Sequence, residues 1–314
     1  MTLATHELPE FAGGAEGKIQ AKSDAAFRRL IAEFLRFYEK SLFNPHWGEQ
    51  AHFGTDNTLS IQMVFIGLTD DQAKAAWKPF REFVAASPND FAYTDELGVG
   101  TMPARHWWDA AWSKEHQRDA FTSDPRPGAP AGNVWWKGNT GECNAFLYGY
   151  ESLWMPAGLL KDPARLADAL FDASRHFEVQ FHFNKGLAGA SAERLAAARD
   201  TAMNPAVTEA FTLALIATGG NPGFKGQEPD PVKGKAEAAA ITAAADRLRV
   251  LAPDSGSYFN ETNYFERAFQ RSFWGPNYPR LARIKKTFDP DGLFFVHNGV
   301  GSEAWSKDGF ERVG

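Results

Sequence analysis

Hydrophobic side chains recur with helical spacing in four parts of the chain. The apolar positions of residues 27–38 repeat every three or four residues, and Ser23 and Asp24 stand before them as N-cap candidates. This pattern predicts an amphipathic helix that begins near residue 24. Three further helices are predicted after the cap residues 69–71, over residues 163–174 and over the Ala-rich residues 235–250.

Strand-like alternation falls between these helices. Alternating or β-branched runs predict strands over residues 59–68, 90–98, 143–154 and 176–184. Residues 208–217 are apolar on all sides, so they fit either a strand or a buried helix, and we favour a strand. Strands interleaved with helices, with polar residues on one strand face, predict an α+β fold: an antiparallel or mixed sheet covered by helices on one face.

Composition excludes several classes of protein. Of 314 residues 44% are hydrophobic and 23% charged, which permits a sizeable core. A net charge of -6 without a basic run argues against nucleic acid as a partner. The single cysteine, Cys143, can form neither an internal disulfide nor a thiolate metal cage. No apolar run is long enough to span a membrane and no signal peptide is visible, so a cytoplasmic protein is expected from the chain as given.

Two segments are open to more than one interpretation. Residues 103–136 are rich in Trp, Pro and Gly and predict a long irregular excursion, whose tryptophans could stack a planar ligand or, as we favour, pack into the core. Residues 186–191 (GLAGAS) follow a strand and precede a helix, as a phosphate loop would. They lack a third glycine and a P-loop lysine, so a simple turn is favoured.

Polar side chains cluster on the strand predicted over residues 176–184. His176 and His182 lie six positions apart and share a face with Glu178 and Gln180. Such a row can face solvent, a substrate or a metal ion. The absence of HxH and HExxH spacing disfavours the metal site.

The richest polar cluster is the segment SYFNETNY, residues 257–264. If it is extended, Tyr258 and Asn260 share one face, while Glu261 and Asn263 share the other. One interpretation is a capped turn. The other is a carboxylate and a phenol placed for proton abstraction, with amides that orient a substrate.

The residues that follow this cluster resemble a known family. The matching positions are Trp274, Gly275, Asn277, Tyr278, Leu281, Ile284, Lys285, Asp289, Pro290, Asp291, Leu293 and Phe294. This order resembles the C-terminal segment of berberine bridge enzyme-like FAD oxidases, which have the vanillyl-alcohol oxidase type of fold. Locally it predicts a short helix from Pro276 or Asn277, with Leu281, Ile284 and Phe288 facing inward, and then a strand over residues 293–296.

The resemblance extends backward and implies roles for the site residues. SYFNETNY is similar to the family's Tyr-x-Asn-Tyr-x-x-Asp stretch, with Tyr258 and Asn260 at matching positions. The family's second Tyr, often the catalytic base, is replaced by Glu261, and its Asp by Tyr264. Glu261 could serve as the base if burial raises its pKa. The expected catalytic residues are therefore Glu261 and Tyr258.

The resemblance also implies a substrate side and a cofactor side. Expected substrate-binding residues are Asn260, Asn263, Tyr264, His182 and Gln180. His297 and Asn298 are expected near the flavin ring, no metal is expected, and the cofactor would be FAD shared with a further domain.

The implied layout is a final strand of an FAD domain in residues 1–10, a substrate-binding domain in residues 11–264 and a C-terminal tail in residues 265–314. The implied reaction transfers a hydride from a small-molecule C–H or alcohol to flavin, which O₂ reoxidises. The alternative is a non-catalytic fragment or split subunit that needs an N-terminal FAD-domain polypeptide as its partner.

Overall fold

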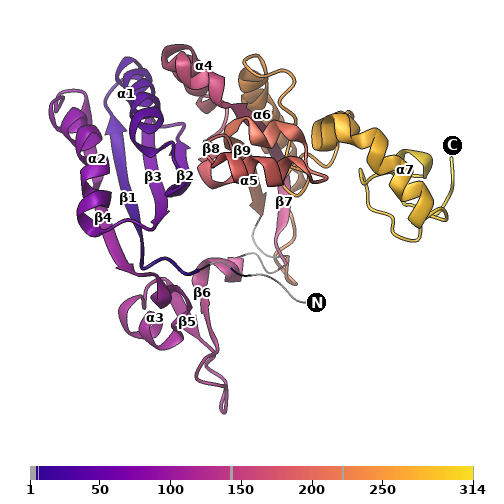
Figure 1. The fold of residues 1–314 in the computed structure, drawn as a ribbon, viewed down its shortest axis with the longest axis horizontal. Helices are drawn as coiled ribbons and strands as arrows, with labels where there is room; N and C mark the ends of the chain where they lie inside the picture. Colours follow the sequence, from indigo (N-terminus) through magenta and orange to yellow (C-terminus); the bar gives the residue numbers. More distant parts are fainter. Residues whose placement is uncertain (1–4, 6, 142–143, 221–222, 314) are drawn as a thin grey trace.

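The chain forms a seven-stranded sheet with helices packed along it and a C-terminal tail at one end (Figure 1). The computed structural model describes residues 5, 7–141, 144–220 and 223–313. Its helices and strands are β1 (Phe11–Ala21), α1 (Asp24–Phe37), β2 (Trp47–Phe53), β3 (Thr58–Ile66), α2 (Asp70–Ala85), β4 (Phe91–Pro103), α3 (Ala110–His116), β5 (Phe121–Ser123), β6 (Val134–Trp136), β7 (Phe146–Pro156), α4 (Pro163–Ser174), β8 (Val179–His182), α5 (Ala192–Arg199), β9 (Ala210–Gly220), α6 (Pro231–Arg249) and α7 (Tyr278–Phe288).

Every pair of neighbouring strands in the sheet is antiparallel. The strand order is β4-β1-β3-β2-β8-β9-β7, so the first and last strands are joined by the excursion over residues 104–145. The register pairs Gln50 with His182 and His52 with Gln180 at the centre of the sheet. Side chains directly opposite in an antiparallel pair point to the same face, so these four lie together.

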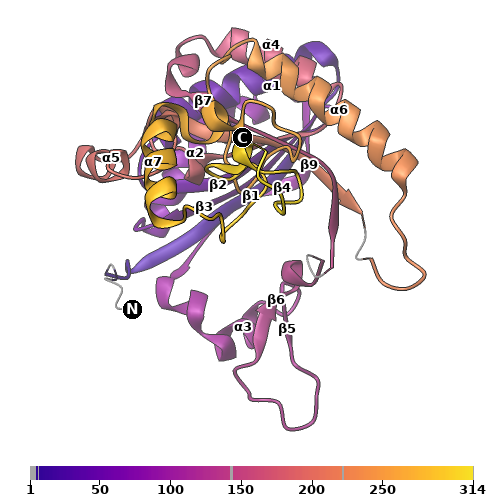
Figure 2. The same cartoon turned by 90° about the vertical axis from the view of Figure 1, so that its right-hand side faces the viewer.

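Helices α1, α4 and α6 lie on one side of the sheet (Figure 2). The apolar stripe of α1, including Phe27, Leu30 and Phe34, is fully buried against side chains of alternate strand positions. Phe34 packs edge-on against Phe53 and Phe80 with ring centroids 6.3 and 5.6 Å away. The predicted α+β fold, with helices on one face of the sheet, is confirmed.

Side-chain caps fix where the predicted helices begin. Ser23 accepts a hydrogen bond from the amide of Ala26 at the start of α1. At α2 the side chains of Thr69 and Gln72 bond to each other's backbone amides and form a capping box. The helices predicted from residues 24, 70 and 163 are confirmed, and residues 210–217 of the favoured strand fall in β9.

Two strands of the seven-stranded sheet were not predicted, and one predicted strand is wrong. Strands β1 and β2 carry Gly, Glu, Lys, Gln and His at alternate positions, which hides their strand pattern. Residues 293–296 form no strand, because no strand of the described chain lies beside them. The α7 stripe also departs from expectation, since Ile284 and Phe288 are exposed.

The excursion between β4 and β7 forms a small unit of its own. Helix α3 and the hairpin β5-β6 project below the sheet in Figure 2. Trp107, Trp108 and Trp136 are exposed there, so the core packing expected for these tryptophans is wrong for these three.

Parts of two predictions fall on residues that the structure does not describe. Cys143, and residues 1–4 and 6 of the strand predicted over residues 1–10, lie outside the described residues. None of the helices in the described ranges has the length and hydropathy needed to cross a bilayer.

Candidate active site

The sheet face opposite the helices carries a connected row of polar side chains. This open face has Glu178, Gln180 and His182 on or beside β8, and Gln50 and His52 on β2. The His52 ring bonds Glu178 Oε1 at 3.0 Å through Nδ1 and Gln50 Oε1 at 2.8 Å through Nε2. Gln180 bonds Glu178 and the His182 ring, each at 3.3 Å. The row is therefore a single hydrogen-bonded network across two strands.

The polar row contains different residues from those expected. Strand β8 begins at Val179, so His176 lies before it, is exposed and takes no part in the network. Gln50 and His52 replace it and were missed, although they alternate with the buried Ala51 and Phe53 in the sequence. That alternation was the available signal. In the described part of the chain no group of His, Cys, Asp or Glu is arranged to hold a metal ion.

The protonation of the row is set by burial and by neighbouring charges. Burial lowers the pKa of His182 to about 4, and Lys185 and His52 act in the same direction. The ring is therefore neutral at pH 7. The hydrogen bond from His52 lowers the pKa of Glu178 below its ordinary value.

The cluster at residues 257–264 is a turn rather than a strand. The amide of Glu261 donates to the carbonyl of Tyr258 at 2.9 Å, which closes the turn. Ser152 on β7 holds it to the sheet, through Ser257 Oγ at 2.7 Å and the amide of Tyr258 at 3.1 Å. Tyr258 packs on Trp154 with a centroid distance of 5.9 Å. The sheet therefore fixes the position of the turn.

Glu261 and Lys185 form an ion pair beside this turn. The Lys185 ammonium donates to Glu261 Oε2 and lies 5.5 Å from the centre of the Tyr258 ring. Both side chains are about one-quarter exposed, at 25% and 27%. Lys185 was not predicted from the sequence. Glu261 is therefore a paired carboxylate rather than an isolated buried one.

Tyr150 completes the charged end of the site. Burial, and then the negative charge of Glu261, raise the pKa of the Tyr150 phenol well above its ordinary value. The phenol therefore stays protonated at neutral pH. Asn260 bonds the Tyr258 hydroxyl at 2.9 Å, so both expected Tyr-x-Asn residues belong to the same turn.

The remaining expected site residues lie apart from Glu261. Asn263 donates to Glu151 Oε1 at 2.9 Å, on the helix side of the sheet. Tyr264 is exposed and stacks on His297 at 4.1 Å. Nε2 of His297 and Nδ2 of Asn298 bond the Tyr264 carbonyl at 2.9 and 3.1 Å. These contacts join the turn to the C-terminal tail.

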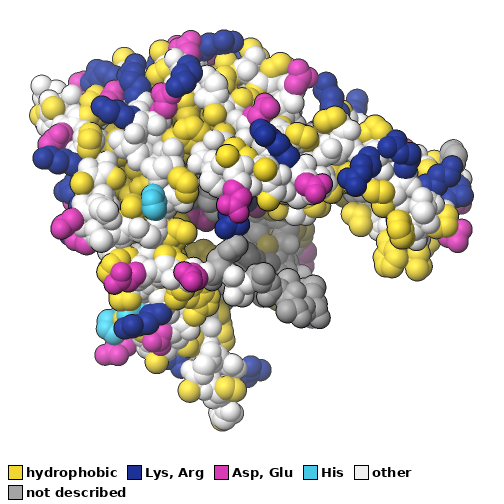
Figure 3. Space-filling view, in the orientation of Figure 1, with side chains coloured by type: hydrophobic (Ala, Val, Ile, Leu, Met, Phe, Trp, Pro, Cys, Tyr) yellow, Lys and Arg dark blue, Asp and Glu magenta, His cyan; other side chains and the backbone are white. Residues whose placement is uncertain are grey.

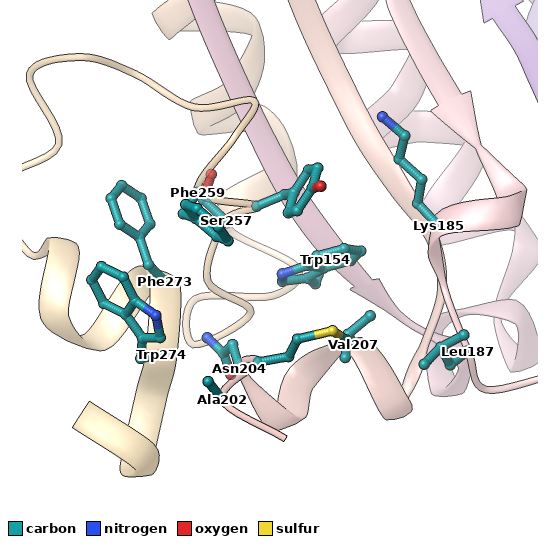
Figure 4. A pocket seen from close by; sticks show the side chains of 12 residues that line it. Trp154, Lys185, Leu187, Ala202, Asn204, Val207, Ser257, Phe259, Phe273 and Trp274 are labelled. Atoms are coloured by element: carbon teal, nitrogen blue, oxygen red, sulfur yellow. The ribbon is translucent and has the colours of Figure 1, made fainter. Parts of the chain in front are cut away.

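A cavity of about 350 Å³ lies between the sheet and the tail (Figure 4). Phe273 and Trp274 lie at one end of it, Lys185 and Leu187 at the other, and Trp154 between them. Its other lining residues are Ala202, Met203, Asn204, Val207, Ser257, Tyr258 and Phe259. The lining is mainly apolar and aromatic, which is typical of small-molecule sites.

The glycine turn at residues 186–191 has a packing role. A Cβ on Gly186 would lie 2.5 Å from the carbonyl oxygen of Ala210, and one on Gly189 would lie 3.0 Å from Phe43. Helix α5 after it is capped by its own Ser191 side chain. The simple turn favoured from the sequence accounts for these glycines.

The tail presents apolar side chains to solvent. Phe288, Leu293, Phe294 and Val296, here called the tail cluster, are 67–83% exposed. Figure 3 shows hydrophobic side chains gathered on the lower side of this end of the molecule. Isolated proteins seldom expose such a group, so the cluster is typical of a surface that is covered by another domain or partner.

Known proteins are similar to this chain in sequence and in architecture. Residues 257–301 match the family model described as berberine and berberine like. An FAD-linked oxidoreductase of Arthroderma benhamiae is 47% identical over 90 residues, which is 29% of this chain and 14% of that protein.

Two solved structures have the same fold. The VAO-type flavoprotein MtVAO615 from Myceliophthora thermophila C1 superposes with a TM-score of 0.64 at 20% identity, covering 95% of this chain and 48% of that one. Glucooligosaccharide oxidase from Acremonium strictum gives a TM-score of 0.60 at 16% identity, covering 94% and 56%. The chain thus spans about half the length of these structures.

The chain resembles the C-terminal part of VAO-type, berberine bridge enzyme-like flavoproteins. The resemblance expected from the sequence is confirmed, and the matched residues hold the turn with Tyr258 and Glu261 together with His297 and Asn298. The three relatives are described as FAD-linked, as a flavoprotein and as an FAD-containing oxidase.

Proposed function

We propose that this chain is the substrate side of an FAD-dependent oxidoreductase that removes a hydride and a proton from a small-molecule alcohol or C–H donor. The observation that carries the proposal is the open face: a half-buried polar network and an ion pair stand beside an apolar cavity, on the side of the sheet opposite α1, α4 and α6. A few polar groups placed beside an apolar cavity are the usual composition of a small-molecule site. The match of residues 257–301 supports the class of cofactor.

The open face fits one side of a planar ring. Gly14 and Gly100 pair across β1 and β4, and a Cβ on Gly98 or Gly100 would meet open space. Strand β3 lies between these glycines and the donors and acceptors of β2 and β8. Ring binding is therefore compatible with this chain, whereas its glycine turn offers no phosphate cradle. The rest of FAD would be held by a further domain, which we propose also covers the tail cluster.

Glu261 is proposed as the base of the reaction. Bound FAD would accept the hydride from the substrate carbon. Glu261 would accept the hydroxyl proton, and its ion pair with Lys185 would orient the carboxylate beforehand. Tyr258 and Asn260 would hold the turn in place, while the protonated Tyr150 would donate a hydrogen bond toward the substrate oxygen. His297 and Asn298 would hold the C-terminal tail against the turn through their bonds to the Tyr264 carbonyl.

The decisive test is Glu261→Gln in the flavin-loaded protein that contains this chain. Loss of the base should slow flavin reduction by substrate about 10²- to 10⁴-fold, with little change in substrate affinity. Stopped-flow absorbance measures both quantities. Asp254→Asn, an exposed carboxylate near the tail, serves as the matched control.

Two outcomes would count against the proposal. Unchanged flavin reduction in Glu261→Gln would remove the residue from the chemistry. A protein that never acquires flavin, with or without a flavin-domain partner, would favour the non-catalytic alternative.

A further inference from the structure

We propose that Glu151 is a positioning residue for Glu261: from the helix side of the sheet it holds the turn at residues 257–264 and so fixes where the carboxylate of Glu261 lies. The inference rests on the proposed function, in which Glu261 is the base. It gives Asn263 a role other than substrate binding, because the amide of Asn263 joins the turn to Glu151.

Two consecutive residues of β7, Glu151 and Ser152, hold this turn from opposite faces of the sheet. Side chains alternate between the two faces along a strand. Leu153 belongs to the core cluster that includes side chains of α6, so Glu151 shares the helix side. Trp154 packs on Tyr258, so Ser152 shares the open face with it. Because β7 is the last strand in the sheet order, the turn can wrap around it and be fastened on both sides.

The carboxylate of Glu151 is buried, and both of its oxygens are engaged. The side chain is 5% exposed. Its Oε2 accepts from Arg249 Nη2 on α6 at 2.5 Å, and its Oε1 accepts from Asn263 Nδ2 at 2.9 Å. Arg249 is held in turn by Asp246 at 2.7 Å. A charge-assisted bond of this kind orients the carboxylate, so Asn263 has an acceptor at a fixed place between the sheet and α6.

Asn263 passes this fixed position on to Glu261, which lies two positions before it. Oδ1 of Asn263 accepts from the amide of Phe265 at 2.8 Å while Nδ2 donates to Glu151, so both ends of the side-chain amide are held. The bonds to Ser152 hold the part of the turn that precedes Glu261. Glu261 therefore lies between two anchors. A displacement of about 1 Å at a reacting group can slow a reaction roughly 100-fold, so the second anchor matters for the proposed chemistry.

The contact is removed from the side of the turn. Glu151→Ala would leave Arg249 without its buried partner, which can unfold the chain. Asn263→Asp keeps the acceptor for the amide of Phe265 and replaces only the donor to Glu151 by a second acceptor. This variant therefore loosens the anchor while the ion pair between Glu151 and α6 stays in place.

The test measures the contact between Lys185 and Glu261 in the purified chain without flavin. Sulfo-N-hydroxysuccinimide acetate acetylates lysine side chains, and mass spectrometry gives the rate at Lys185. The Lys185 ammonium is bonded to Glu261, so it must leave the carboxylate to react. In Asn263→Asp the rate at Lys185 should rise about two- to fivefold, the factor by which a partly exposed ion pair holds its members together.

A double-mutant cycle separates positioning from general loosening of the fold. Glu261→Ala removes the acceptor of Lys185, so Asn263→Asp should cause no further rise in that background. Simple destabilisation would raise the rate in both backgrounds. Asn57→Asp is the matched control, because Asn57 donates to Asp24 Oδ1 at the same 2.9 Å in the turn between β2 and β3. It should leave the rate at Lys185 unchanged.

The outcomes distinguish this inference from the proposed function. An unchanged rate at Lys185 in Asn263→Asp, or an equal rise in the Glu261→Ala background, would overturn the role of Glu151 and leave Glu261 as the base. Unchanged flavin reduction in Glu261→Gln would instead overturn the proposed function, and the role of Glu151 in the reaction with it.

Discussion

Helices α1 and α7 carry the same kind of apolar stripe, yet only α1 buries it. Phe27, Leu30 and Phe34 of α1 pack into the core against the sheet and are 0% exposed. Ile284 and Phe288 of α7 are 41% and 83% exposed. A periodic apolar stripe indicates that one face of a helix is buried, but it does not identify the surface that buries it. For α1 the cover is the sheet of this chain. For α7 we propose that it is the flavin domain.

The largest expected effect is on the free energy of unfolding and comes from the buried stripe of α1. Phe34→Ala would remove a fully buried ring that packs on Phe53 and Phe80, so it should lower the free energy of unfolding by about 3–5 kcal/mol. Phe288→Ala removes the same ring from an exposed place and should change it by less than about 0.5 kcal/mol. Urea denaturation followed by fluorescence measures both. Comparable losses in the two variants would mean that α7 is already covered.

The open face of the sheet gives the next effect, through His182. Its pKa is about 4 in the folded chain against an ordinary 6.5, so the unfolded chain binds the extra proton first as pH falls. Stability is complete above pH 6.5 and should decline as pH falls toward 4. The shift corresponds to about 3 kcal/mol at most. Urea midpoints collected across this pH range measure the decline.

His182→Gln supplies the control for that pH dependence. Glutamine cannot titrate, so the variant should lose most of the slope between pH 6.5 and 4 while keeping a polar side chain in the row. A slope that persists in the variant would assign the proton uptake to other groups. Covering the open face with a bound ligand should leave the His182 contribution in place, because burial is its main cause.

The third effect concerns the tail cluster. If the tail cluster is a surface that normally packs against another domain, the purified chain should self-associate through it. Phe294→Asp should weaken that association. Burying one such ring is worth about 2 kcal/mol, or roughly a 30-fold change in the association constant. Sedimentation velocity over a range of concentrations measures it. Val232→Asp, equally exposed on α6, should have no comparable effect.

Prediction from sequence succeeded where the signal is local. Caps and stripes located α1 and α2, because Ser23 and Thr69 accept hydrogen bonds from amides within the next few residues. It failed where the pairing of strands that are distant in the sequence determines the structure. Strand β1 holds alternating Glu16 and Lys18 and is a strand only because β3 and β4 flank it. Residues 293–296 have strand-forming side chains, but among the described residues no strand lies beside them.

The candidate site shows the same division. Tyr258, Asn260 and Glu261 came from a segment eight residues long, and the structure keeps them in one turn. Lys185 lies 76 positions before Glu261, so its pairing was invisible in the sequence. Gln50 enters the open-face network through the register of β2 and β8. Long-range register, rather than local pattern, determined which polar residues meet.

The smallest effect tests how much a cap contributes when burial is also present. Thr69→Ala would leave the amide of Gln72 without its side-chain partner and break the capping box of α2, at a cost of about 1 kcal/mol. Thr69→Ser keeps the hydroxyl and should cost only a few tenths. Urea denaturation can resolve the two variants. If Thr69→Ala were as stable as wild type, then burial of Trp77 and Phe80 alone would fix where α2 begins, and the stripe would outweigh the cap.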